Sequence, residues 1–218
     1  MSQNDSQWVF SCWDWLEYKS SIFCSIAINY SASHLRPREW QHKSHNQGAS
    51  DSTHNFLRDW KGPPILALVI GINKYINESC LRFAVGDADT FEQFLTERLN
   101  VPDANIISLR DEQASRAAIL SAFVSLKDNA KYQKDEAAII IYYAGHGAQT
   151  DKPKNWQDWV TGSEHIEMLC PSDIGCTTSV NGEDVIIQGI PDRTISVLLN
   201  HISDVKGNNI VSMFNSSE

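Results

Sequence analysis

The sequence predicts an α/β fold, a three-layer sandwich in which helices cover both faces of a mostly parallel sheet. From residue 62 onward, strand-like runs alternate with amphipathic helical stretches, the order typical of an open parallel sheet. The runs at 63–72 and 137–144 are apolar at consecutive positions, as strands buried on both faces are. With 218 residues, 42% of them hydrophobic and 21% charged, the chain is long enough for one soluble domain with a sizeable core.

The first half of this region predicts two strands and two helices. The run "PPILALVIGI" (63–72) predicts a central strand. The stretch "DADTFEQFLTERLN" (87–100) predicts a helix with one apolar stripe and with acids in its first turn, where the helix dipole favours them. The run "NIISL" (105–109) predicts a short strand. The stretch "SRAAILSAFVSLKDNA" (115–130) predicts a helix that is capped by Ser115 and has an apolar inward face.

The second half predicts three strands and one helix. The run "AAIIIYYA" (137–144) predicts the third strand, and "IEML" (166–169) predicts a short fourth strand after a polar loop. The stretch "IPDRTISVLLNHIS" (190–203) opens with Pro191, a good first-turn residue, and predicts the last helix. The run "NNIVSMF" (208–214) predicts the last strand.

Composition and charge argue against several classes of partner. The formal net charge is −9 and no cluster of Lys and Arg occurs, so we expect neither a nucleic acid nor a membrane surface as partner. The five cysteines are an odd number without zinc-like pairing, which indicates neither a disulfide framework nor a structural metal site. The sequence begins with no basic leader, and no window is long enough to span a bilayer. We therefore expect a cytoplasmic protein.

Residues 1–62 are predicted to form an irregular N-terminal extension, and residues 63–218 the folded domain. The extension holds five of the seven tryptophans and four of the seven histidines, without helical or alternating periodicity. The tryptophans can anchor it to a partner or to the domain; the alternative is a poorly ordered leader. Its histidines share no regular ligand spacing, so they do not indicate a metal site.

His146 follows the third predicted strand and lies between Gly145 and Gly147. Ligands and chemistry collect outside the carboxyl ends of the strands in open parallel sheets. A histidine there can accept and donate a proton near neutral pH, and the N–H of Gly147 can stabilise an oxyanion. The two glycines can adopt backbone conformations closed to other residues, and without side chains they let the backbone of another molecule approach closely. The alternative is a glycine-bordered turn whose histidine bonds to a neighbouring carbonyl.

Seven stretches spanning roughly residues 64–210 resemble, in order and spacing, the large-subunit half of caspase-like domains, with fungal metacaspases the most similar. They read "ILALVIGINKY", "GDAD", "ISLRDEQASRAAI", "IIIYYAGHGA", "LCPSD", "GIPDRT" and "KGNNI". The resemblance implies a six-stranded, mostly parallel sheet and cleavage of a protein or peptide substrate by a Cys-His dyad without a cofactor. It also implies that His146 is the histidine of the dyad and that the Gly147 amide contributes to the oxyanion hole.

The cysteine of the dyad is missing from the sequence. In the family it follows the strand after the "KGNNI" equivalent, but here the pattern departs after Val211 and no cysteine occurs beyond Cys176. A histidine without its sulfur cannot form an acyl-enzyme. We therefore expect a domain truncated before the catalytic cysteine, a sheet incomplete at its C-terminal side, and no peptidase activity. Cys170 is expected to be a buried core thiol rather than a replacement nucleophile.

Asp87 of "GDAD" resembles the acid with which metacaspases bind a basic residue before the scissile bond. A buried carboxylate selects Arg or Lys by charge pairing. The alternative is that Asp87 is only an acid in the first turn of the helix, where the helix dipole favours a negative charge. Asp89 fits that description equally well. By a distant resemblance to calcium-dependent metacaspases, Asp173 is a candidate calcium ligand. One carboxylate does not make a calcium site. The sequence therefore supports no metal.

Two functions from different classes follow from these observations. The first is a caspase-like cysteine endopeptidase whose chain is cut short before the cysteine. The second is a catalytically inactive caspase-like module that binds or regulates an intact homologue. Nucleotide binding is set aside, because "VIGINKY" lacks the glycine spacing and the GK[ST] ending of a phosphate-binding loop.

Overall fold

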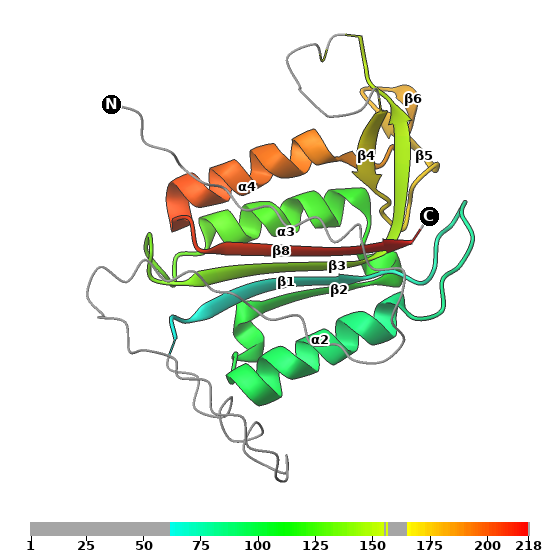
Figure 1. The fold of residues 1–218 in the computed structure, drawn as a ribbon. Coiled ribbons are helices and arrows are strands. Elements are labelled where there is room, and N and C mark those ends of the chain that lie inside the picture. Colours follow the sequence, from blue (N-terminus) through cyan, green and yellow to red (C-terminus); the bar gives the residue numbers. More distant parts are fainter. Residues whose placement is uncertain (1–61, 155, 157–164, 218) are drawn as a thin grey trace, which may run out of the picture.

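Figure 1 shows the fold in a computed structural model of the chain, which describes residues 62–154, 156 and 165–217. The predicted N-terminal extension, residues 1–62, lies outside the described residues except for Gly62, and so do its tryptophans, its histidines and two of the cysteines. In the described part of the chain, no helix combines the length and the apolar character that a membrane span needs.

Four parallel strands form the centre of the sheet. Strand β1 (Ile65–Gly71) pairs with β2 (Ile106–Arg110) on one side and with β3 (Ala138–Asp151) on the other. Strand β3 also pairs with β8 (Ile210–Ser217), so the order is β2-β1-β3-β8. Every residue of β1 is buried, which confirms the predicted central strand.

Helices cover both faces of this sheet (Figure 1). Helix α2 (Ala84–Leu99) lies on one face, and α3 (Arg116–Asp128) and α4 (Asp192–Lys206) lie on the other. Because side chains alternate along a strand, β1 contributes to two cores. One contains Leu66, Leu68, Ile70 and residues of α3 and α4; the other contains Ile65, Ala67, Val69 and residues of α2. This arrangement confirms the predicted three-layer sandwich.

The start of α3 is fixed by two side chains. Ser115 caps it as predicted, with its Oγ accepting a hydrogen bond from the Ala118 N–H at 3.3 Å. Asp173, from a distant loop, accepts a second bond from the Arg116 N–H at 2.8 Å. The Asp173 carboxylate therefore satisfies an otherwise unpaired amide of the first turn.

Strand β3 continues well beyond its predicted end at residue 144. Its first half pairs with β1 and β8, and its second half pairs antiparallel with β4 (His165–Leu169). Strand β4 in turn pairs with the short β7 (Ile190–Pro191). The fourth strand predicted at 166–169 is thus confirmed, with its partner strand now identified.

His146 therefore lies within a strand and not after one. Of the two reasons for the glycines, a backbone conformation closed to other residues does not apply, because neither Gly145 nor Gly147 has a positive φ. A glycine pair resembles a turn signal, but a strand also needs glycine where other groups approach its backbone closely. The structure shows that this second reason applies here.

A two-stranded hairpin, β5 (Thr177–Val180) and β6 (Glu183–Ile186), was not predicted. Its turn is formed by Asn181 and Gly182, which have φ values of 54° and 86°. Asn-Gly between two strand-like runs is a strong hairpin signal, so the sequence did contain the information. Two short 3₁₀ helices, η1 (Asp103–Asn105) and η2 (Asp111–Gln113), flank β2.

Candidate active site

The backbone of His146 lies where β3 changes partners. The last pair between β1 and β3 joins Gly71 to Ala144, and the first pair between β3 and β4 joins Gly147 to Leu169. His146 falls between these two ladders. On that side, its backbone is therefore bonded partly by groups that do not belong to a neighbouring strand. This is the carboxyl edge of the parallel strands, as the sequence predicts.

Two tyrosines hold the backbone of His146. Its N–H donates to the Tyr75 Oη at 2.7 Å, and the Tyr143 Oη donates to its carbonyl oxygen at 2.7 Å. The Tyr143 Oη also lies 2.9 Å from the carbonyl oxygen of Cys170. Burial raises the pKa of Tyr75 to about 12 and the pKa of Tyr143 well above its ordinary value. Both phenols therefore stay neutral near physiological pH and keep these bonds.

Gly145 is glycine because the two phenols occupy the space beside it. A Cβ added there would lie 2.6 Å from the Tyr143 Oη and 2.7 Å from the Tyr75 Oη. Both distances are too short for atoms that are not bonded. The first glycine of the GHG motif thus lets two hydroxyls reach the histidine backbone.

The imidazole of His146 is oriented by the loop between β1 and α2. Its Nε2 lies 2.8 Å from the carbonyl oxygen of Ser79, and its ring lies 4.8 Å, centroid to centroid, from the ring of Tyr75. A carbonyl can only accept, so Nε2 carries a proton, and in the neutral imidazole the lone pair is then on Nδ1. A half-buried imidazole with its lone pair on Nδ1 is what a general base requires.

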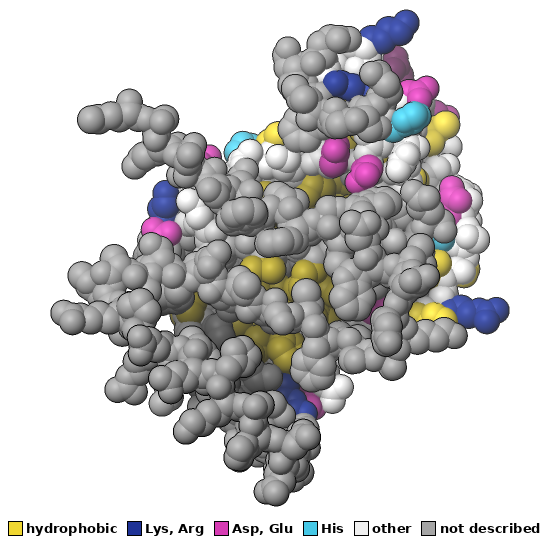
Figure 2. All heavy atoms as spheres, viewed as in Figure 1, with side chains coloured by type: hydrophobic (Ala, Val, Ile, Leu, Met, Phe, Trp, Pro, Cys, Tyr) yellow, Lys and Arg dark blue, Asp and Glu magenta, His cyan; other side chains and the backbone are white. Residues whose placement is uncertain are grey.

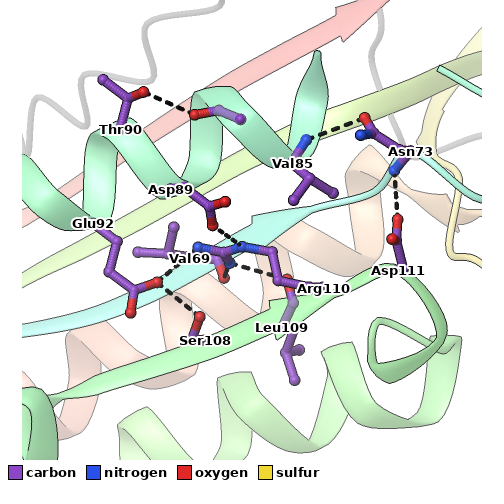
Figure 3. Close-up of polar contacts among 11 residues, drawn as sticks. Val69, Asn73, Val85, Asp89, Thr90, Glu92, Ser108, Leu109, Arg110 and Asp111 are labelled. Carbon is purple, nitrogen blue, oxygen red and sulfur yellow. Dashed lines mark hydrogen bonds and ion pairs between the residues drawn. The ribbon is translucent and has the colours of Figure 1, made fainter. Parts of the chain in front are cut away.

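Asp111 anchors the loop that carries Tyr75 and Ser79. Its Oδ1 accepts from the backbone N–H groups of Asn73 at 2.8 Å and of Lys74 at 3.0 Å, and Figure 3 shows the first of these bonds. The Asn73 side chain in turn accepts from the Val85 N–H at 3.1 Å, which ties the loop to the start of α2. The loop is thus held at both ends.

Sequence reasoning did not single out Tyr75, Ser79 or Asp111. One signal was present, because Asp111 follows β2 directly and so lies at the same edge of the sheet as the end of β1. Ser79 acts through its backbone carbonyl, which every residue has, so the identity of the side chain does not reveal this role. The geometry of the loop was needed to find it.

Gly147 lies against the end of β8. A Cβ added to Gly147 would lie 2.9 Å from the Ser216 Cβ and 3.0 Å from the Ser216 Oγ. The Ile139 N–H donates to Asn209 beside β8, and amides alternate between the two edges of a strand. Gly147 comes eight positions after Ile139, an even offset, so its N–H also faces the β8 edge.

Asp87 lies in the first turn of α2, half-buried, and burial raises its pKa. Its charge contributes to the raised pKa of Tyr142, after the larger effect of burial, so the carboxyl group lies near that phenol. Tyr142 and His146 are on the same face of β3, because side chains alternate along a strand. The structure therefore places Asp87 and His146 on the α2 side of the sheet.

Asp89, the second acid of "GDAD", lies in the second turn of α2 and has a structural partner. Its Oδ1 accepts from the Arg110 Nε at 2.9 Å, and Arg110 also donates to Glu92 at 2.7 Å and to the Val69 carbonyl oxygen at 2.8 Å. Figure 3 shows this network between α2 and β2. No ion pair to Asp87 occurs among the described residues. Asp89 is therefore held in an ion pair with Arg110, whereas Asp87 forms no ion pair with a described residue.

Three cysteines lie in the described part of the chain, and they differ in exposure. Cys80 is exposed in the loop next to Ser79, Cys176 is partly buried, and Cys170 is only 3% exposed. Burial raises the pKa of the Cys170 thiol to about 11. Because the thiolate is the nucleophile, Cys170 is unreactive near neutral pH, which agrees with the predicted core thiol.

Alkylation should separate these thiols. Near pH 8 we expect iodoacetamide to modify Cys80 at least about 100-fold faster than Cys170, since a pKa raised from 9.0 to about 11 lowers the thiolate fraction by that factor. The neutral Cys170 thiol should contribute stability that is complete below about pH 9 and is lost as the pH rises toward 11, because the unfolded thiol ionises first. Mass spectrometry of the native protein, with Cys170→Ala as control, measures both rates. Equal rates would contradict the assignment.

The candidate calcium ligand Asp173 is engaged at the start of α3, as described above. Within the described residues, no three histidine, cysteine or acidic side chains are grouped as metal ligands would be. The groups that the structure brings together around His146 are two phenols and the backbone carbonyl of Ser79.

Comparisons with known proteins assign the family. The family model described as "Caspase domain" matches residues 65–198, more than half of the chain. Metacaspase-1 of Candida albicans is 32% identical over 114 residues, which cover 49% of this chain and 25% of that protein. Metacaspase-1A of Aspergillus oryzae is 32% identical over 90 residues, or 38% of this chain and 21% of that protein. The chain thus spans a quarter or less of the length of these curated relatives.

Among solved structures, protein GSU0716 of Geobacter sulfurreducens aligns with a TM-score of 0.48 and 17% sequence identity. The alignment covers 70% of this chain and 49% of that one. The family match includes β1, α2, β3 and the loop that carries Tyr75 and Ser79, so His146 and Gly147 are among the matched residues. The chain belongs to the caspase domain family.

Proposed function

We propose that this site is of the cysteine-endopeptidase type, built to transfer the acyl group of a peptide bond through a Cys-His dyad. The observation that carries the proposal is the imidazole of His146. It is oriented by the Ser79 carbonyl with its lone pair on Nδ1, beside the Gly147 amide, in a chain of the caspase domain family. The substrate would be a protein or peptide.

The chemistry follows from these groups. His146 Nδ1 would take the proton of a thiol, and the thiolate would attack the carbonyl carbon of the scissile bond. The Gly147 N–H would stabilise the resulting oxyanion. The imidazolium would then return the proton to the leaving amine, and water would release the acyl group. These steps require no metal or organic cofactor.

The thiol is the group that this sequence does not supply to His146. Of the cysteines that the structure describes, Cys170 is buried and Cys176 lies between β4 and β5. Cys80 is exposed next to Ser79, whose carbonyl meets Nε2 of His146 and not the Nδ1 that would take the proton of the thiol. We therefore propose that the chain with this sequence, acting in the cytoplasm, binds peptide at the site without cleaving it.

Asp87 would select the peptide. It is half-buried, without an ion-pair partner among the described residues, and on the same side of the sheet as His146. A partly desolvated carboxylate favours a cation, so we propose that it binds an Arg or Lys preceding the scissile bond. The raised pKa of Asp87 would fall again when such a cation binds.

A second candidate function is that of a binding or regulatory module for an intact caspase-like homologue. It is favoured by β8, which among the described residues pairs only with β3 and so leaves its other edge available. Residues 210–214 of β8 are only partly buried. Figure 2 shows hydrophobic side chains near the centre of the face that is also seen in Figure 1. Strand addition at such an edge is a common mode of protein recognition.

Peptide turnover and peptide binding test the two parts of the proposal. A panel of fluorogenic peptides with a basic or an acidic residue before the scissile bond should give only background turnover with the wild type and with His146→Ala. The basic peptides should bind more tightly than the acidic ones, and Asp87→Asn should weaken that binding about tenfold or more. Cleavage by the wild type that His146→Ala abolishes would overturn the proposed inactivity. Equal binding of both peptide types would exclude the role of Asp87.

A further inference from the structure

Strand β8 ends beside His146. The sequence predicts that this strand stops at residue 214, but it continues to Ser217. Its parallel register with β3 begins at the pair of Ile139 and Ile210 and ends at the pair of His146 and Ser217. The residue in register with the candidate general base is therefore a serine.

We propose that position 217 is the nucleophile position of this site, and that Ser217 stands where the mechanism requires a cysteine. The inference rests on the proposed function, because only an acyl-transfer site has a nucleophile position. It differs from the sequence-based expectation, in which the chain ends before that position is reached.

The distance between the strands supports this assignment. Neighbouring strands lie about 4.8 Å apart, and residues paired in register lie on the same face of a sheet. A nucleophile and its base must come within about 3 Å through their side chains, which residues at this separation can reach. The next residue along β3, Gly147, turns its N–H toward the same edge. Base, oxyanion donor and position 217 therefore converge at the ends of two adjacent strands.

Side chains just before position 217 fix the register of β8. The Asn215 side chain lies close enough to the Tyr142 phenol of β3 to lower its pKa, against the larger effect of burial, and Ser216 packs against Gly147 so closely that a Cβ on Gly147 would lie 2.9 Å from the Ser216 Cβ. A slip of one residue would break both contacts and would move alternate side chains to the other face. The pairing of position 217 with His146 is thus supported from both strands.

The residue type explains why the site would not turn over. A serine hydroxyl is a much weaker acid than a thiol, and it needs a base whose charged form is stabilised by a third group, often a carboxylate. Here the third group is the neutral carbonyl of Ser79, at 2.8 Å from Nε2. Such an arrangement suits a thiol, which ionises more readily, better than a hydroxyl.

The test is to introduce sulfur at this position in the full chain. In Ser217→Cys, the thiol at position 217 should react with iodoacetamide near pH 6 at least tenfold faster than the thiol of the control Ser212→Cys. Ser212 lies on the same strand but is in register with Ile141, too far from His146. Adding His146→Ala to Ser217→Cys should remove the advantage. Equal rates for the two thiols, or a rate that does not depend on His146, would overturn the proposal.

A disulfide measures the geometry independently of reactivity. Paired Cα atoms about 4.8 Å apart fall within the range that a disulfide spans. The double variant His146→Cys with Ser217→Cys should therefore crosslink under mild oxidation, and His146→Cys with Ser212→Cys should not. The reverse result would place position 217 elsewhere, even if the single variant folds poorly.

Peptide assays on Ser217→Cys separate this inference from the proposed function. Turnover that depends on His146 would support both. A fast, His146-dependent thiol together with neither peptide cleavage nor peptide binding would support the nucleophile position and would overturn the proposed function. A thiol that shows no dependence on His146, in a protein that still binds basic peptides, would overturn only the inference.

Discussion

Replacing Gly145 with alanine is expected to lower the free energy of unfolding by roughly 3 kcal/mol and to release the backbone of His146. The new Cβ would lie 2.6 Å from the Tyr143 Oη and 2.7 Å from the Tyr75 Oη. Both rings are buried, at 0% and 7% exposure, so neither hydroxyl can move away without disturbing the core. The hydrogen bonds between the two phenols and the backbone of His146 would be lost with the same displacement.

Urea denaturation of the wild type and of Gly145→Ala measures this effect. The variant Tyr75→Phe provides the matched control, because it removes one of the two hydroxyls that the new Cβ meets. The change Gly145→Ala should therefore cost less free energy in the Tyr75→Phe background than in the wild type. If the cost is the same in both, the phenols are not what makes glycine necessary at this position.

The layers of the fold follow from signals that are local in the sequence. The apolar run of β1 predicts a strand buried on both faces, and all its residues are buried. The apolar stripe of α3 predicts its inward face, and Ile119, Phe123 and Leu126 are buried there. Such patterns repeat within a few residues, so they need no knowledge of the rest of the chain.

The parts that the sequence could not predict depend on contacts between distant segments. Whether a glycine bends the chain or makes room beside it depends on what lies opposite, and for Gly145 that is Tyr75, from another loop. The role of Ser79 comes from its backbone carbonyl, so the residue type contains no signal. The register of β8 against His146 likewise depends on pairing between strands distant in sequence.

The structure also explains why the histidine was predictable and the nucleophile position was not. His146 lies between two glycines after an apolar run, a pattern that can be recognised by itself. Position 217 has no such pattern, because it is defined by its place beside β3 and not by its residue type. A search for cysteine overlooks a position that is occupied by serine.

Replacing Gly71 with alanine is the second change for which we expect a large loss of stability. A Cβ at Gly71 would lie 2.6 Å from the Ala88 Cβ, 2.9 Å from the Ala84 carbonyl oxygen and 3.0 Å from the Val85 Cα. Two of these atoms belong to the backbone of α2, so the first turn of the helix would have to move as a unit. Overpacking of this kind should cost roughly 3 kcal/mol.

The control for Gly71→Ala lies on the helix that it displaces. A Cβ at Gly86 of α2 would meet no atom within 4 Å, so Gly86→Ala should stabilise the protein by up to about 1 kcal/mol, through the better helix propensity of alanine. The two variants should therefore shift the urea midpoint in opposite directions. A Gly71→Ala variant as stable as the wild type would mean that α2 can move away from β1. Asp87, in the first turn of α2, would then not be held in a fixed place for a peptide.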